Sequence, residues 1–169
     1  MKKSEDSPDM KIIKTSNTET LTGKSKLTYQ IGISPESIVH LRISKNSGGG
    51  FFSGEWIEFD AVLDALQKLP KDTGISSYYL AHLFKGKSVN TPSFLLSVLK
   101  HLKIVRALPK NKRHHELLDP MPFLDQVTQL MDNGAKSGGG TRKAAGAATK
   151  NTATKKAAIK KKAMARRKA

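Results

Sequence analysis

Two short stretches of the chain alternate between apolar and polar residues with a period of two, as half-buried β-strands do. They are 27–34 (LTYQIGIS) and 38–44 (IVHLRIS), and turn residues separate them. A glycine-rich turn then precedes 51–57 (FFSGEWI), which has the composition of a third strand. We therefore expect a small antiparallel β-meander over 27–57, preceded by a flexible N-terminal segment over 1–26.

The spacing of apolar residues changes to that of helices after this meander. Apolar side chains repeat at i, i+3, i+4 and i+7 over 59–69, and Pro70 ends that helix. A second helix is predicted over 76–84, with serine as its N-cap. A third begins at Thr91, because threonine followed by proline is typical of a helix start. Its apolar stripe extends to Leu102.

Two strands and one more helix complete the predicted body. Residues 104–108 (IVRAL) and 113–118 (RHHELL) predict two strands joined by a tight turn that contains Pro109. A short helix follows over about 122–131. The predicted fold class is α+β, with one folded domain over 27–133.

Three helices followed by a basic two-stranded loop resemble the winged helix-turn-helix family, over about 58–118. The resemblance is carried by the pair 80–81 (LA), the run 89–94 (VNTPSF) and the run 99–105 (LKHLKIV), which is similar to the L-x-x-L-x-[IL]-V junction of many bacterial repressors. It implies a winged-helix-like body whose third helix enters the major groove of DNA. Lys103 departs from the pattern, because the family usually has a glycine there.

A second resemblance assigns the recognition helix differently. The run 77–102 also resembles the third and fourth helices of the five-helix domain of phage repressors. That resemblance implies that 76–84 is the recognition helix, and it leaves the basic hairpin without a role.

The charge of the chain is concentrated at its C-terminal end. The formal net charge is +16, and 12 of the 30 Lys and Arg residues lie in 134–169, which holds no acidic residue. Such a segment repels itself and has few large apolar side chains to bury, so we expect a disordered basic tail. Its lysine and alanine content resembles the arms of linker histones and bacterial histone-like proteins, which implies retention on DNA through counterion release.

Candidate DNA-binding residues follow from the winged-helix resemblance and from the charge. Residues 85–113 hold eight basic residues and no acidic one. The family geometry implies that the outer side of the third helix reaches base edges, while the turn and the wing contact phosphate. The candidates are Lys85, Lys87, Ser93, Leu96, Ser97, Lys100, Lys110, Lys112 and Arg113 in the body, and Lys155, Lys156, Lys160, Lys161, Lys162, Arg166, Arg167 and Lys168 in the tail.

The composition argues against several other classes of protein. Without cysteine the chain has no disulfide, thiolate zinc site or iron–sulfur centre. Its five histidines lack metal-ligand spacing, and no nucleophile elbow is present. We therefore expect no enzyme, no cofactor and no metal. The longest apolar run is far shorter than the ~20 residues that span a bilayer, and no signal peptide is visible. We expect no membrane contact, and a cytoplasmic, nucleoid-associated location.

The expected function is that of a DNA-binding protein, either a transcriptional regulator or a nucleoid-associated protein, with double-stranded DNA as its partner. The body would give a weak sequence preference, and the tail would give non-specific affinity. One alternative is an RNA-binding or ribosome-associated protein in which Phe51, Phe52 and Trp56 stack bases. Another is a protein–protein adaptor. A homodimer through the strands of 27–57 is a further possibility.

Overall fold

The computed structural model describes residues 9–70, 73–86 and 88–136 of the chain. The chain divides into two units, one up to Asp119 and one from Pro120 onward. The described part of the second unit is helix α3 with the residue before it, so the first unit holds the sheet and the remaining helices.

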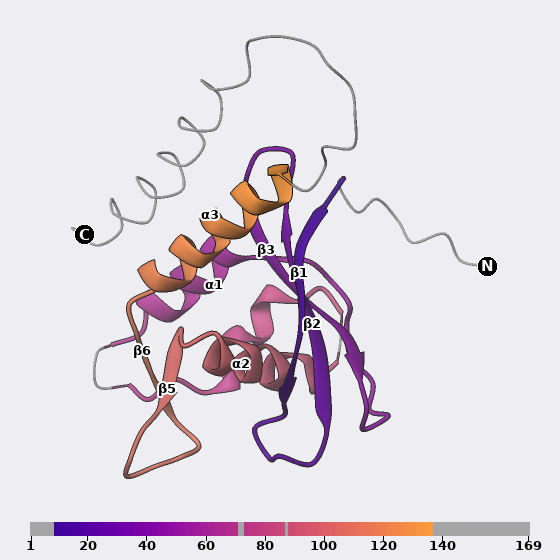
Figure 1. Ribbon diagram of the computed structural model, residues 1–169. Helices are drawn as coiled ribbons and strands as arrows, with labels where there is room; N and C mark the ends of the chain where they lie inside the picture. The colour runs from indigo at the N-terminus through magenta and orange to yellow at the C-terminus, as the bar shows by residue number, and fades with distance from the viewer. Residues whose placement is uncertain (1–8, 71–72, 87, 137–169) are drawn as a thin grey trace, which may run out of the picture. The chain divides into compact units, whose positions relative to one another are not determined.

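A four-stranded antiparallel sheet forms one layer of the first unit (Figure 1). Its strands are β1 (Lys11–Glu19), β2 (Lys26–Ile33), β3 (Val39–Asn46) and the two-residue β4 (Ile57–Glu58), in the order β1-β2-β3-β4. The period-two pattern places alternate residues of β2 and β3 on one buried face, which confirms the two strands expected from it. That face carries Leu27, Tyr29, Ile31, Ile33, Val39, Leu41 and Ile43.

Two expectations for the N-terminal half are wrong. The segment expected to be flexible contains β1, which pairs with β2 along its whole length. Because β1 is an edge strand of mainly polar residues, with Ile12 45% exposed, it lacks the alternation that marked its neighbours. The expected third strand is reduced to β4, and residues 51–56 form no strand. Strand β1 therefore forms the edge of the sheet beside β2. This edge lies outside 27–57, the strands through which the sequence suggested a homodimer.

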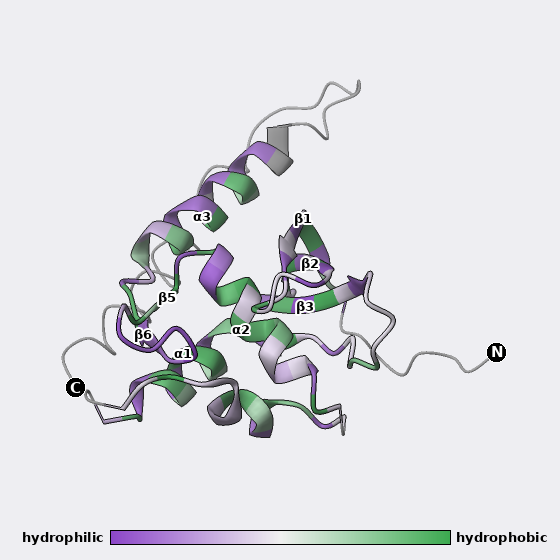
Figure 2. Ribbon diagram, turned by 90° about the horizontal axis from the view of Figure 1, so that it is seen from below, coloured by the Kyte–Doolittle hydropathy of each residue, from purple (hydrophilic) through white to green (hydrophobic). Residues whose placement is uncertain are grey.

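Helix α2 (Thr91–His101) occupies the middle of the first unit. It contacts β1 and β3 of the sheet as well as the 3-10 helix η1 (Ser77–Leu83) and strand β5 (Val105–Ala107). Figure 2 shows α2 between the sheet on one side and α1 on the other. Helix α1 (Phe59–Gln67) contacts η1 and β3. All three helices expected from the periodicity are therefore present, the second as a 3-10 helix.

A small hairpin follows α2. Strand β5 pairs antiparallel with β6 (His115–Leu117), as expected, and the connecting loop 108–114 projects away from the helices (Figure 1). Ile75, between α1 and η1, adds a third pairing. Its backbone N–H donates to the His115 carbonyl at 2.7 Å, and the His115 N–H donates to the Ile75 carbonyl at 2.8 Å. The hairpin is thereby tied to the helical layer.

Helix α2 ends at a left-handed residue although Lys103, and not a glycine, occupies that position. Lys103 adopts a left-handed conformation with φ of 58°, so that its N–H reaches the Lys100 carbonyl and the Ile104 N–H reaches the Leu99 carbonyl. These are the bonds that close a helix when the residue after its C-cap is left-handed, a position that is usually glycine. A side chain at positive φ costs about 1–2 kcal/mol.

Replacing Lys103 by glycine is expected to stabilise the protein by about 0.5–1 kcal/mol, because the strain relieved exceeds the entropy that glycine loses. Denaturant unfolding followed through the fluorescence of Trp56, the single tryptophan, measures this change. The control Lys103→Ala removes the same charge but keeps the strain, so it is expected to give no gain. Equal stabilisation by both substitutions would contradict the strain at this position.

The second unit is described as a single helix, α3 (Met121–Lys136), which is longer than the 122–131 expected. In its sequence, Phe123, Val127 and Leu130 recur at helical spacing. Within the described ranges of the chain, no helix combines the length and the apolar character needed to cross a membrane.

Candidate nucleic-acid interface

The outer side of α2, expected to read bases, is not available. Leu96 is 1% exposed and Ser97 is 3% exposed. Ser93 is half-buried, and its hydroxyl donates to the Ser77 hydroxyl at 3.1 Å. The prediction that these side chains enter a groove is therefore wrong. The physical reason is that α2 contacts β1 and β3, so that the sheet covers this side of the helix. Of this set, Lys100 alone remains exposed.

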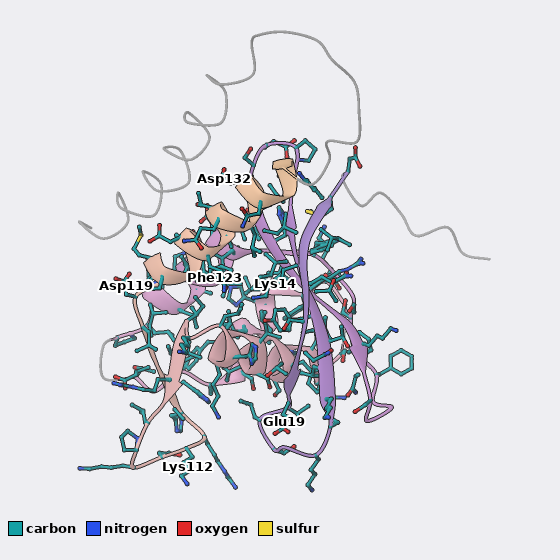
Figure 3. All side chains as sticks on the ribbon, in the orientation of Figure 1. Lys14, Glu19, Lys112, Asp119, Phe123 and Asp132 are labelled. Atoms are coloured by element: carbon teal, nitrogen blue, oxygen red, sulfur yellow. The ribbon has the colours of Figure 1, made fainter. Side chains whose placement is uncertain are left out.

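Eight exposed cations of the first unit gather at one end, whereas Lys11, Lys68 and Lys85 are exposed elsewhere. The loop 108–114, the turn between β1 and β2 and the end of β3 lie at the lower side of Figure 1, which Figure 2 shows from below. The C-terminal end of α2 borders this turn, because Lys100 and His101 line one hollow with residues 18–23. Figure 3 labels Lys112 on the hairpin loop and Glu19 beside the β1–β2 turn, both in the lower part of the view. We call this surface the basic face. Its exposed cations are Lys24, Lys26, Lys45, Lys100, Lys103, Lys110, Lys112 and Arg113.

Contacts between these segments support the grouping. The residues 18–23 of the β1–β2 turn line a hollow of about 480 Å³ together with Ser97, Lys100 and His101 of α2. The Lys26 N–H donates to the Ser47 hydroxyl at 2.8 Å, which joins the start of β2 to the end of β3. The charge of Lys100 in turn lies near enough to His115 of β6 to affect its pKa.

Acidic residues lie mainly away from the basic face. Glu36 lies in the turn between β2 and β3, at the opposite end of the sheet from Lys26. On the hairpin, Glu116 is paired with Arg106 at 2.7 Å, so their charges offset each other. Glu19 is the exposed acidic residue that remains among the eight cations. The charge of the described part of the first unit is therefore distributed asymmetrically, with a positive surface at one end.

Sequence reasoning found part of this surface. It selected Lys100, Lys110, Lys112 and Arg113, all of which are exposed on the basic face. It did not select Lys103. It also missed the cations of the β1–β2 turn and of the end of β3, because nothing in the sequence signals that these segments lie beside the end of α2. Lys87 and the eight predicted tail residues (Lys155, Lys156, Lys160, Lys161, Lys162, Arg166, Arg167 and Lys168) lie outside the described residues.

Lys85 belongs to a different surface, because it lies before the N-terminal end of α2. The Glu55 carboxylate accepts hydrogen bonds from the backbone N–H groups of Lys85 (2.9 Å) and Gly86 (2.7 Å) and from the Ser53 hydroxyl. Burial alone would raise the pKa of Glu55, but these hydrogen bonds and the Lys85 charge lower it below its ordinary value. Glu55 thus clamps this loop, and the Lys85 side chain stays exposed.

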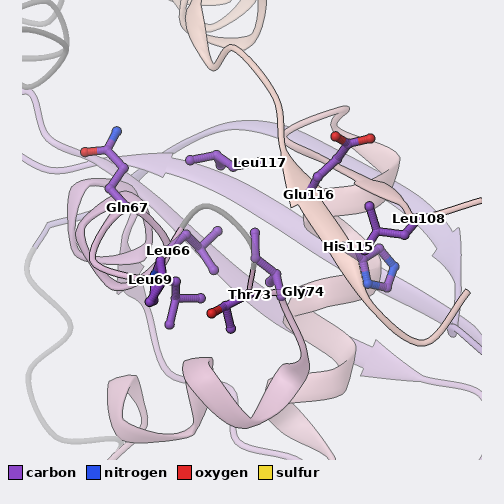
Figure 4. Close-up of a pocket in the computed structure, with 11 residues that line it drawn as sticks. Leu66, Gln67, Leu69, Thr73, Gly74, Leu108, His115, Glu116 and Leu117 are labelled. Atoms are coloured by element: carbon purple, nitrogen blue, oxygen red, sulfur yellow. The ribbon is translucent and has the colours of Figure 1, made fainter. Parts of the chain in front are cut away.

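His115 lies where the loop hairpin joins the rest of the unit, and it is 1% exposed. It lines a pocket of about 510 Å³, with the end of α1 on one side and β6 on the other (Figure 4). Neither ring nitrogen makes a well-aligned hydrogen bond to a described residue. Burial lowers the pKa of the imidazole; the Ile75 backbone partly offsets this, and the charges of Lys100 and His114 lower it further. The folded protein therefore favours the neutral form of His115 more strongly than the unfolded chain does.

The free energy of unfolding is expected to fall as the pH drops below about 6.5, the ordinary pKa of histidine. Below that pH the unfolded chain binds a proton on His115 that the folded chain does not, so stability is lost toward acid and is complete above it. His115→Leu is expected to flatten this part of the stability profile in denaturant unfolding at several pH values. The control His82→Gln replaces an exposed histidine of η1. An unchanged acid-side loss in His115→Leu would refute the assignment.

The three aromatic residues of the RNA alternative differ in their surroundings. Trp56 is half-buried: the Arg42 guanidinium lies 4.5 Å from its ring centre, and its ring lies so close to Gly32 that a Cβ there would meet it at 2.8 Å. Phe52 is also half-buried, with its ring centre 6.5 Å from that of Phe94. Phe51, in contrast, is 89% exposed.

Within the described ranges, no three His, Asp or Glu side chains come together as metal ligands would. Comparison of the chain with protein-family models, with curated proteins and with solved structures finds no match.

Proposed function

We propose that this protein binds duplex DNA through its basic face and that residues 59–117 are a winged-helix-type unit. The order of elements supports the second part: three helices are followed by a two-stranded loop, to which Ile75 adds a third pairing. In this proposal the loop 108–114 acts as the wing and meets the DNA, whereas α2 keeps the unit together. It departs from groove reading by the third helix because that side of α2 is buried.

One observation carries the proposal: eight exposed cations from four separate segments of the chain share one end of the first unit. Phosphate groups spaced along a nucleic-acid backbone are the ligand that such a surface attracts most strongly, because each contact releases condensed counterions. Cations that served only to keep the surface solvated would not need to gather at one end, with most acidic residues elsewhere.

The chemistry of the basic face also indicates how selective the binding is. Lysine side chains contact phosphate as point charges and carry little base discrimination. Arg113 is the single arginine of the surface. We therefore expect little sequence preference, which suits a nucleoid-associated or architectural role better than recognition of one operator. The 12 cations of 134–169 add further non-specific affinity.

The test is fluorescence anisotropy of the full chain with two labelled duplexes of unrelated sequence, from 50 to 500 mM salt. We expect similar affinities for both duplexes, with the logarithm of the association constant falling linearly and steeply with the logarithm of salt concentration. Failure to bind either duplex at the lowest salt concentration would favour the protein–protein adaptor. A large preference for one duplex would argue for groove reading.

A further inference from the structure

A second surface, at the N-terminal end of α2, exposes two large apolar side chains. Phe51 is 89% exposed and Val89 is 87% exposed. Both line a hollow of about 480 Å³, together with Phe52 and Asn90. Single exposed apolar residues are ordinary, but neighbouring ones on one surface mark a binding site more often.

The two loops that carry these side chains are tied together. The Phe51 carbonyl accepts hydrogen bonds from the Ser88 hydroxyl (2.8 Å) and the Asn90 side-chain amide (3.2 Å). The Ser53 N–H donates to the Thr91 hydroxyl at 2.8 Å, and Glu55 clamps the other end of the loop as described above. Phe51 is therefore presented by a backbone that is already held, so that binding costs little ordering entropy.

The charges around Phe51 indicate what kind of ligand fits. Lys85 belongs to the same pair of loops. Lys45, the cation of the basic face at the end of β3, is shared with this second surface: it precedes Asn46, whose side-chain amide donates to the Gly50 carbonyl at 3.4 Å. Both lysines are exposed. The acidic residue of these loops, Glu55, is engaged by three hydrogen bonds. An open aromatic ring flanked by cations is the combination that binds single-stranded nucleic acid, because any base can stack on the ring while the cations contact phosphate.

We infer that Phe51 is a stacking platform for an unpaired base of single-stranded nucleic acid, with Lys45 and Lys85 beside the flanking phosphates. The inference rests on the proposed function only in taking nucleic acid as the ligand, since this site is separate from the wing. Phe52 and Trp56 take no part in the stacking, because their rings pack against Phe94 and over Gly32. A protein with both surfaces would bind best where duplex and single strand meet.

The test measures the affinity of the full chain for a labelled 15-nucleotide oligo(dT) and for a duplex of the same length, by anisotropy at one salt concentration. Phe51→Ala is expected to weaken oligo(dT) binding about tenfold, the loss of one stacked base, and to leave duplex binding unchanged. Phe51→Trp keeps a stacking ring and is expected to retain oligo(dT) affinity. The control Tyr78→Ala removes an aromatic side chain of η1 that is 80% exposed and outside the platform, so we expect no effect.

The possible outcomes separate this inference from the proposed function. Duplex binding that persists while Phe51→Ala leaves oligo(dT) affinity unchanged would overturn the platform alone. If the unsubstituted protein bound neither oligo(dT) nor the duplex, both the platform and the proposed function would be overturned. Self-association that Phe51→Ala abolishes, seen as a halved mass in sedimentation, would assign the exposed ring to a second copy of the chain and would also overturn the platform.

Discussion

Replacing Leu96 by alanine is expected to lower the free energy of unfolding by about 3 kcal/mol, since truncating a buried leucine costs about 2–5 kcal/mol. Leu96 is 1% exposed and lies on the side of α2 that the sequence predicted to face DNA. If this side faced solvent or DNA, the same substitution would change stability by at most about 0.5 kcal/mol. Denaturant unfolding followed through Trp56 fluorescence separates these two results.

A matched control is available in the segment just before α2. Val89→Ala also removes apolar atoms, but from a side chain that is 87% exposed, so we expect a change within about 0.5 kcal/mol. At temperatures where both variants are folded, we expect Leu96→Ala to bind duplex DNA as the unsubstituted protein does. A stable Leu96→Ala variant with weakened DNA binding would restore α2 as the recognition helix and would contradict the enclosed position described here.

The enclosed position of α2 had a signal in the sequence. No charged residue occurs between Thr91 and Leu99, and a helix without a charged side is usually buried all round. The serines at 93 and 97 suggest a polar side, but both hydroxyls are satisfied close by: Ser97 donates to the Ser93 carbonyl at 2.9 Å, and Ser93 bonds to Ser77. Small hydroxyl side chains can thus line a packed helix surface.

Local periodicity predicted the elements whose one face is strongly apolar, namely β2, β3, α1 and α2. It failed for β1 because an edge strand gains its stability from backbone pairing with β2 and keeps polar side chains. That single omission had consequences for the site. The turn that carries Lys24 and Lys26 reaches the end of α2 only because β1 pairs with β2, so a surface assembled from both could not be predicted from either segment.

Neutralising the wing with Lys110→Gln, Lys112→Gln and Arg113→Gln in one variant is expected to weaken duplex binding about a hundredfold at 0.15 M salt. Each phosphate contact contributes about 0.9 to the slope of log affinity against log salt, so three lost contacts lower its magnitude by about 2.7. At 0.15 M this slope change corresponds to about two powers of ten. Anisotropy with the full chain over a range of salt concentrations measures both quantities.

The informative comparison keeps the net charge equal and changes only its position. Lys11→Gln, Lys14→Gln and Lys68→Gln also remove three positive charges, but from the start and middle of β1 and from the residue after α1. If DNA meets the basic face, this control keeps nearly the full slope, because its charges make no phosphate contact. An equal loss in both triple variants would mean that total charge alone sets the affinity. The tail would then suffice as the DNA-binding element, and the gathering of cations around the wing would have no part in binding.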